Sequence, residues 1–216
     1  MILSIDTTSE FGSLALTEAE RTIEEFAIHS PDGFGHVLYE HLEQLLGRHA
    51  MNVNHLECFV AASGPGSFTG VRVGLAAVKG LAEATGKKVI AVSNLRAIAS
   101  FGSAPLRATV LDARRGEVYA AVYNHKLEII MPEVVVPYNV WPKTLPSHGF
   151  EIISPDFSAL RNLIDGSVPT VTAPRALAGA IARIAWTEFR HGRACDPAEI
   201  DANYVRRSDA ELFWKE

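Results

Sequence analysis

ILSIDTTSEFGSLAL, residues 2–16, predicts a β-hairpin at the start of the chain. The apolar run 2–5 ends at Asp6, polar residues follow, and a second apolar run begins after Gly12. This order is typical of a strand, a polar turn and a second strand. Because a third strand is expected over 22–28, the chain opens with three strands joined by hairpins.

Helices and strands alternate after this antiparallel part. A helix is predicted over 35–49, where one face collects Val37, Leu38, His41, Leu42, Leu45 and Leu46. Further elements are expected at 59–63 (strand), 71–84 (helix), 88–92 (strand) and 94–101 (helix). Hairpin-linked strands followed by helix and strand in alternation predict a mixed sheet.

The pattern restarts after the turn-forming residues 102–105. A strand at 108–111 ends at Asp112, and strands at 118–123 and 127–136 follow a polar turn. Asp6 and Asp112 therefore hold the same place, the carboxyl end of the first strand in each half. We expect two domains, residues 1–104 and residues 105–216.

The rest of the second half departs from the repeat. A proline-rich stretch, 132–146, stands where the first helix would be. A strand at 151–153, a short helix near 157–164 and a long helix over 174–191 are expected, with Pro174 in the first turn of the long helix. The second domain is thus predicted to be a degenerate copy with a C-terminal helix and tail.

Two related βββαβα-type domains, the second degenerate, are typical of the α/β architecture shared by actin, sugar kinases and heat-shock ATPases (ASKHA). In that architecture each first hairpin holds a phosphate of ATP, and glycine in the turn lets backbone N–H groups reach it. The candidate nucleotide-binding residues are Asp6, Thr7, Thr8 and Asp112. Neither aspartate has glycine beside it, which weakens this hypothesis. The alternative is that both accept hydrogen bonds from their own turns.

GPGSFTGVRVG, residues 64–74, lies between a predicted strand and a predicted helix. It lacks the Gly-Lys-Ser/Thr of a Walker loop, and its glycines miss the GxGxxG spacing by one residue. We interpret its first part as a structural motif with a tight turn and a helix cap from Ser67 or Thr69. The motif comprises Gly64, Pro65, Gly66, Ser67, Phe68 and Thr69. The small residues Gly70, Gly74, Ala77 and Ala84 flatten one helix face, which serves either the internal sheet or a partner subunit.

Composition places the chain among ordinary globular proteins, with 48% hydrophobic and 21% charged residues. No apolar run reaches the roughly 18–20 residues of a membrane span, and the early acid Asp6 is untypical of a signal peptide, so we expect a cytoplasmic protein. The net charge of −5 argues against independent tight binding of nucleic acid. Cys58 and Cys195 lack metal-ligand spacing and are expected to be reduced and buried.

Sequence motifs for catalysis or metal binding are missing. His36 and His41 are five residues apart, about 140° around a helix, whereas histidines that share one ion are four apart. Neither HExxH nor GxSxG occurs. We therefore expect neither a metal site nor catalytic residues.

Four segments together resemble the TsaB family, also called YeaZ. They are ILSIDTTSEFGSLAL (2–16), GPGSFTGVRVGLAAVKGLA (64–82), DARRGEVYAAVY (112–123) and YVRRSDAE (204–211). The similarity covers most of the chain except about 132–171. It implies a shortened relative of TsaD, the metal-dependent catalytic subunit, that pairs with TsaD through the helices near 35–49 and 71–84. It also implies a homodimer when TsaD is absent, and support, together with the ATPase TsaE, for threonylcarbamoyl transfer to the adenosine beside the tRNA anticodon.

The resemblance implies a non-catalytic subunit without a cofactor of its own. ATP or ADP is expected only at a partner interface, and tRNA contact only through the complex. The implied interface residues are His41, Leu45, Gly70, Arg72, Gly74, Ala77, Val78 and Leu81. Bulky residues at Gly74 or Ala77 are then expected to disrupt pairing and leave the fold intact. The alternatives are an ATP-dependent phosphotransferase of the sugar-kinase type, which needs glycine-lined phosphate hairpins, and a peptidase, for which no motif is found.

Overall fold

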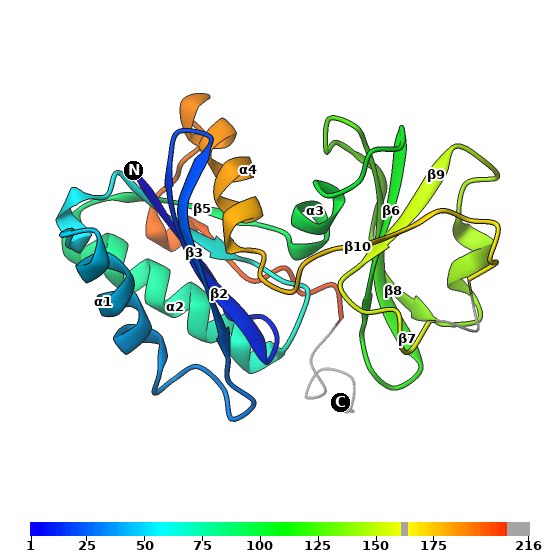
Figure 1. Cartoon of the computed structure of the whole chain (residues 1–216), viewed down its shortest axis with the longest axis horizontal. Coiled ribbons are helices and arrows are strands. Elements are labelled where there is room, and N and C mark those ends of the chain that lie inside the picture. Colours follow the sequence, from blue (N-terminus) through cyan, green and yellow to red (C-terminus); the bar gives the residue numbers. More distant parts are fainter. Residues whose placement is uncertain (161–163, 207–216) are drawn as a thin grey trace, which may run out of the picture. The chain divides into compact units, whose positions relative to one another are not determined.

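The computed structural model describes residues 1–160 and 164–206. The chain forms two compact units, each described here by itself. Unit 1 comprises Met1–Ala97 and Arg175–Ala202, and unit 2 comprises Ile98–Pro174 and the residues from Asn203 on. Each unit contains one five-stranded mixed sheet (Figure 1).

The sheet of unit 1 has the order β3-β2-β1-β4-β5. Its strands are β1 (Ile2–Asp6), β2 (Phe11–Glu18), β3 (Arg21–His29), β4 (Cys58–Ala62) and β5 (Lys88–Val92). The first three strands pair antiparallel, whereas β4 pairs parallel with both β1 and β5. The predicted hairpin-linked strands and parallel crossovers are confirmed.

Helices cover both faces of this sheet (Figure 1). They are α1 (Leu38–Arg48), α2 (Phe68–Thr85) and α4 (Ala178–Arg190), while the short α3 (Asn94–Ala99) follows β5. Alternate residues of β1 point to opposite faces: Leu3 and Ile5 join the hydrophobic core under α1 and α2, whereas the Ser4 hydroxyl donates to the Ala178 carbonyl of α4 at 2.6 Å. Thus α1 and α2 lie on one face of the sheet, and α4 lies on the other.

The sheet of unit 2 has the order β10-β9-β6-β7-β8. Its strands are β6 (Leu106–Asp112), β7 (Glu117–Asn124), β8 (Ile129–Pro137), β9 (Phe150–Ser154) and β10 (Thr170–Thr172). One face buries Ala108, Val110, Val118, Val122, Trp141 and Ile152. In the described part of the chain, the remaining regular structure is three short 3-10 turns, Val53–His55, Trp141–Thr144 and Pro197–Glu199.

The long C-terminal helix differs from the prediction in start and in domain. It begins at Ala178 rather than near Pro174, and it packs against β1 and β2 of unit 1 instead of belonging to the second domain. Its buried face carries Ala178, Ile181 and Ala185, and this apolar surface covers the side of β1 that α1 and α2 leave open. A domain division at residue 104 separates this helix from the sheet that it covers.

Two smaller expectations also differ. The strand β10 was not predicted, because three residues are too few to show a period of two. The short helix expected near 157–164 is replaced at Phe157–Leu160 by a turn, and residues 161–163 lie outside the described part of the chain. Among the described residues, no helix combines the length and the apolar character needed to cross a membrane.

Candidate functional site: two strand-end turns and the outer face of α2

The turn after β1 is folded around the carboxylate of Asp6. The Thr8 amide and hydroxyl both donate to Asp6 Oδ1, at 3.0 and 2.7 Å, and Asn94 Nδ2 lies 3.4 Å from Oδ2. Asp6 is only 2% exposed, and this burial raises its pKa because the charged form loses its hydration. The Thr8 N–H, which a phosphate-binding turn would offer to a ligand, is directed at the chain's own carboxylate.

Asn94 connects this turn to the GPGSFTG segment. Its amide nitrogen Nδ2 also donates to the Thr8 hydroxyl at 2.8 Å, and its Oδ1 accepts from the Gly64 N–H at 3.1 Å. The backbone N–H of Asn94 donates to the Gly64 carbonyl at 2.9 Å. One side chain at the start of α3 therefore joins the ends of β1 and β4, and the peptide bond that follows Gly64 is cis.

The glycines of the segment allow backbone to meet backbone. A Cβ on Gly66 would lie 2.4 Å from the Thr8 carbonyl oxygen, and one on Gly70 would lie 2.0 Å from that of Thr7. The Ser67 N–H donates to the Thr8 carbonyl at 2.7 Å, and the Thr7 hydroxyl donates to the Gly70 carbonyl at 2.7 Å. The start of α2 is thus packed directly on the β1–β2 turn.

Ser67 caps α2, as predicted. Its side chain accepts the Gly70 N–H at 3.3 Å, and the helix ends at Gly86, whose φ of 65° is left-handed. The sequence left open whether Ser67 or Thr69 has this role. The contacts of Gly64, Gly66 and Ser67 are those of a tight turn that leads into a capped helix.

The amino-terminal end of α4 is satisfied by side chains of the sheet. The Ser13 hydroxyl accepts the N–H groups of Leu177 and Ala178 at 3.1 and 2.9 Å, and Glu25 accepts that of Gly179 at 2.8 Å. Burial raises the pKa of Glu25. A helix start that would otherwise attract an anion is therefore occupied by the chain's own carboxyl group.

The corresponding turn of unit 2 is open by comparison. Asp112 Oδ1 accepts the Arg114 N–H at 2.7 Å and the Tyr138 hydroxyl at 2.6 Å, and the guanidinium of Arg114 lies 3.6 Å from Oδ2. The side chain of Arg114 is 84% exposed. Burial and the Asp112 carboxylate raise the pKa of Tyr138 to about 12. Each aspartate accepts hydrogen bonds from its own turn, as the alternative reading expected.

On the small-residue face of α2, Gly70, Gly74 and Ala77 point inward and Ala84 is exposed, and this corrects the proposed interface. Gly70 and Gly74 contact Thr7, and a Cβ on Gly74 would lie 2.6 Å from its hydroxyl oxygen. Ala77, Val78 and, on α1, Leu45 are buried in the core of unit 1. The sequence spacing was equally compatible with an internal and an external face; the contacts assign these five interface candidates to the interior.

The outer face of α2 carries a different set of residues. Phe68 is 41% exposed, and the guanidinium of Arg72 lies over its ring at 3.7 Å from the centroid. One and two turns further on, Ala76 and Gly80 are exposed. Of the predicted interface residues, Arg72 is exposed, whereas Leu81 and His41 are half-buried.

The histidines show no metal-binding arrangement. His36 is exposed and precedes α1, while the ring of His41 packs against Phe26 at 5.1 Å between centroids. Within residues 1–160 and 164–206, no cluster of three or more His, Cys, Asp or Glu side chains is placed to hold an ion. Both cysteines are free thiols; Cys58 is buried and Cys195 is half-buried.

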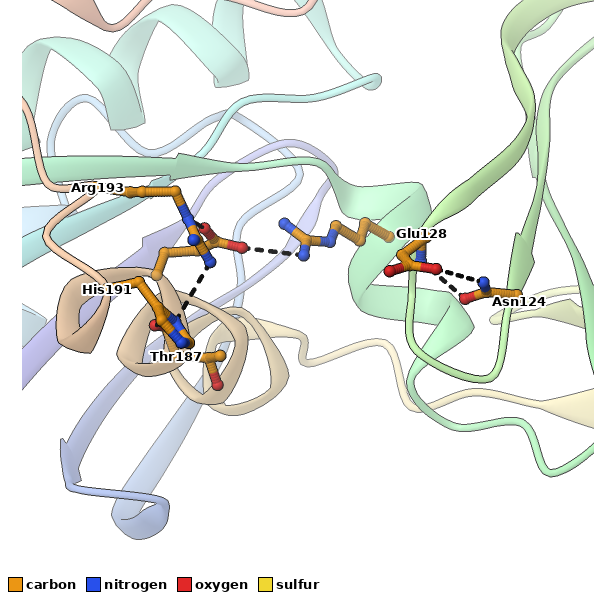
Figure 2. Close-up of polar contacts among 7 residues, drawn as sticks. Asn124, Glu128, Thr187, His191 and Arg193 are labelled. Atoms are coloured by element: carbon orange, nitrogen blue, oxygen red, sulfur yellow. Dashed lines mark hydrogen bonds and ion pairs between the residues drawn. The ribbon is translucent and has the colours of Figure 1, made fainter.

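Other polar clusters hold elements in place. In unit 1, Glu188 of α4 pairs with Arg96 of α3 at 3.0 Å and with Arg193, and His191 Nδ1 lies 2.7 Å from the Thr187 carbonyl (Figure 2). In unit 2, the Asn124 side chain donates to Glu128 at 2.7 Å across the β7–β8 turn (Figure 2). Because these clusters hold elements together, the candidate functional features are the strand-end turn of each unit and the outer face of α2 in unit 1.

Sequence reasoning missed the residues that support the two turns and the start of α4. Asn94 and Ser13 were not identified, because each acts on a residue far away in the sequence. Glu25 was missed for the same reason, and so was Tyr138, which lies 26 residues after Asp112. The one available signal was the position of Asn94 as the first residue of a predicted helix, two residues after a predicted strand.

The comparisons with known proteins agree with this structure. Residues 34–141 match the model of the family TsaD: tRNA N6-adenosine threonylcarbamoyltransferase. The tRNA threonylcarbamoyladenosine biosynthesis protein TsaB of Bacillus subtilis is 29% identical over 224 residues, covering 100% of this chain and 98% of that protein. An uncharacterised protein of Mycobacterium tuberculosis is 33% identical over 166 residues, covering 75% of this chain and 70% of that one.

A solved structure shows the same fold. YeaZ from Pseudomonas aeruginosa superposes with a TM-score of 0.82 at 23% identity, covering 94% of this chain and 98% of that one. The predicted two-domain α/β architecture, with one mixed sheet in each domain, is therefore confirmed. Since half of the chain matches the TsaD family model and TsaB proteins align along nearly its whole length, the chain belongs to the TsaB (YeaZ) family.

Proposed function

We propose that this chain takes part in the biosynthesis of threonylcarbamoyladenosine on tRNA as a non-catalytic partner of a TsaD-type subunit, together with a TsaE-type ATPase. Family membership supports the pathway, since named relatives are tRNA threonylcarbamoyladenosine biosynthesis proteins. The partner role rests on the site. In this proposal tRNA is reached only through the complex, and the chain forms a homodimer when the partner is absent.

We propose a non-catalytic role because the polar backbone groups of the β1–β2 turn are already bound within the chain. A phosphate-binding turn must direct free N–H groups at its ligand. Here the Thr8 N–H is bound to Asp6, and the carbonyl oxygens of Thr7 and Thr8 contact the start of α2. Asp6 is buried among Thr8 and Asn94. We therefore propose that the isolated chain holds no nucleotide at Asp6, Thr7 and Thr8.

The surface proposed to bind the partner is the outer side of α1 and α2. Tyr39 of α1 is 57% exposed, and Phe68 of α2 is 41% exposed. The small residues Ala76 and Gly80 on the exposed side of α2 allow a helix of another subunit to approach closely. A cationic side chain, Arg72, stacked on Phe68 supplies the combination of aromatic and arginine groups that is enriched at interface centres.

Pairing is tested by titrating the purified chain with its TsaD-type subunit in a calorimeter. We expect Arg72→Glu to weaken binding at least tenfold, about 1.4 kcal/mol or more. Arg21→Glu is the matched control, because Arg21 is equally cationic and its side chain is 78% exposed at the β2–β3 turn. Equal affinities of the two variants would reject this surface, and no binding by the wild type would reject the partner role.

The absence of catalysis is tested on the isolated chain. We expect no ATP hydrolysis above the buffer rate and no saturable ATP binding in equilibrium dialysis. ATP turnover that disappears on Asp6→Ala would favour the phosphotransferase alternative over the partner role. The Asp112→Ala variant is measured beside it, because Asp112 is the candidate of the other unit.

A further inference from the structure

Arg206 bridges the two ends of the β6–β7 turn. Its Nη1 donates to the Ala113 carbonyl at 2.8 Å, and its Nη2 is bound to the Glu117 carboxylate. The guanidinium also lies over the ring of Tyr119, 5.6 Å from the centroid. Only 19% of the Arg206 side chain is exposed. One side chain from near the end of the described chain is thus built into a hairpin about ninety residues earlier.

A second anchor lies three residues before Arg206. Asn203 donates its side-chain amide to Glu133 of β8, and the other oxygen of Glu133 accepts the hydroxyl of Tyr123. Residues 203–206 contain neither helix nor strand. This segment, here called the strap, is attached to β7, β8 and the turn at both of its ends.

The turn held by the strap has an uncommon backbone. Arg114, Arg115 and Gly116 have consecutive positive φ angles of 62°, 58° and 78°. Two of these residues are not glycine, and left-handed backbone is unfavourable for residues with a Cβ. Such a conformation persists only where surrounding contacts impose it.

Hydrogen bonds inside the hairpin supply part of that constraint. The Ala113 N–H donates to the Glu117 carbonyl at 2.9 Å, and the Glu117 N–H donates to the Arg114 carbonyl at 3.1 Å. Arg206 acts on the same two residues, Ala113 and Glu117, from outside the hairpin. It therefore fixes the distance between the two ends of the left-handed segment.

We propose that residues 203–206 are a strap that keeps the β6–β7 turn in its left-handed conformation, with Arg206 as the positioning residue. The backbone conformation of residues 113–117 then depends on the position of the strap. Removal of the strap, by cleavage after Ala202 or by its capture on another molecule, loosens the turn. By linkage, a ligand that orders the turn also holds the strap more tightly. This coupling is independent of the partner role proposed above.

Amide hydrogen exchange of the full-length chain tests the strap residue by residue. In Arg206→Gln we expect the Ala113 and Glu117 amides to exchange at least about tenfold faster, because local opening sets their exchange. The amides of Val118 and Val122, in the sheet itself, keep the wild-type rate. Arg21→Gln is the matched control, since Arg21 lies at an exposed turn of unit 1, and it leaves all four rates unchanged.

Two further variants separate the anchors. Glu117→Gln removes the ion pair and keeps the Arg206–Ala113 hydrogen bond, so we expect a smaller acceleration than in Arg206→Gln. Arg206→Lys keeps the charge but not the two-point contact, and is expected to restore the turn only in part. Wild-type exchange at Ala113 and Glu117 in Arg206→Gln would overturn the proposal. Equal acceleration throughout β6 and β7 would overturn it too, since that result means general destabilisation.

Discussion

The turns after β1 and after β6 have a similar sequence, but the first turn is buried and the second is partly exposed. Both begin with an aspartate at the end of the first strand of a sheet. Asp6 is 2% exposed and is enclosed by Thr8, Asn94 and the start of α2. Asp112 keeps a side chain that is 30% exposed, beside an arginine that is 84% exposed. The first turn is internal structure, and the second remains available at the surface.

The difference shows that the elements packed on a strand-end turn decide whether the turn is buried. In unit 1 the glycines at 66 and 70 let a helix start lie against the carbonyl oxygens of the turn. Among the described residues of unit 2 no α-helix follows β8, and the turn is held by side chains from Tyr138 and Arg206. In unit 1, Gly66 and Gly70 therefore allow two backbone segments to approach closely. In unit 2, Gly116 instead allows a left-handed backbone conformation.

The largest expected effect comes from filling the contact in unit 1. Gly70→Ala places a Cβ 2.0 Å from the Thr7 carbonyl oxygen, and neither backbone can move without shifting β1 or α2. We expect a loss of about 3 kcal/mol in the free energy of unfolding, measured by urea denaturation. Gly80→Ala is the control in the same helix, because nothing lies within 4 Å of the new Cβ. It should stabilise the chain by about 0.5–1 kcal/mol. Equal effects would show that the turn is not packed as described.

The second effect concerns the buried carboxylate. Asn94→Ala leaves one oxygen of Asp6 and the Gly64 N–H without their partner. Unsatisfied buried groups cost about 1–3 kcal/mol, so we expect a loss near 2 kcal/mol on urea denaturation. Asn124→Ala, which removes a half-buried asparagine with an exposed hydrogen bond at the β7–β8 turn, is the control and should cost much less. A small effect of Asn94→Ala would mean that water replaces the side chain and that the Asp6 turn is as open as the Asp112 turn.

The third effect probes the turn of unit 2 by the same glycine-to-alanine change. Nothing lies within 4 Å of a Cβ on Gly116, but its φ of 78° is left-handed. Gly116→Ala is therefore expected to cost about 1–2 kcal/mol through the backbone alone, less than Gly70→Ala. Hydrogen exchange should locate the change at residues 113–117. A cost equal to that of Gly70→Ala would contradict the view that Gly70 is required for steric reasons and Gly116 for its backbone conformation.

Most helices and strands could be predicted because their formation depends on neighbouring residues in the sequence. The strand over 88–92 is confirmed to the residue, and the α2 helix was expected from residue 71 and observed from Phe68. The place of α4 was not predictable, since its attachment to Ser13 and Glu25 joins residues more than 150 positions apart. The inward direction of Gly70 and Gly74 was undecided for a related reason: helical spacing defines a face, not the surface that the face meets.

The smallest expected effect is a pH dependence from Glu25, whose carboxyl group lies at the start of α4. Burial raises its pKa in the folded chain, and the charge of Asp6 adds to this, although the Gly179 N–H and Arg183 act in the opposite direction. The folded state therefore binds more protons than the unfolded state above the ordinary glutamate pKa. The contribution of Glu25 to stability is full below that value and is lost as pH rises through the raised pKa.

Glu25→Gln removes this titration and keeps a carbonyl oxygen for the Gly179 N–H. We expect the stability of the variant relative to the wild type to increase as pH rises from about 4 to about 7, in urea denaturation at each pH. Glu83→Gln, at an exposed acid of α2, is the control without this trend. A relative stability that falls with rising pH would mean that the amino-terminal end of α4 stabilises the anion more than burial penalises it. In that case this helix start would resemble an anion site, and the contrast between a closed unit 1 and an open unit 2 would weaken.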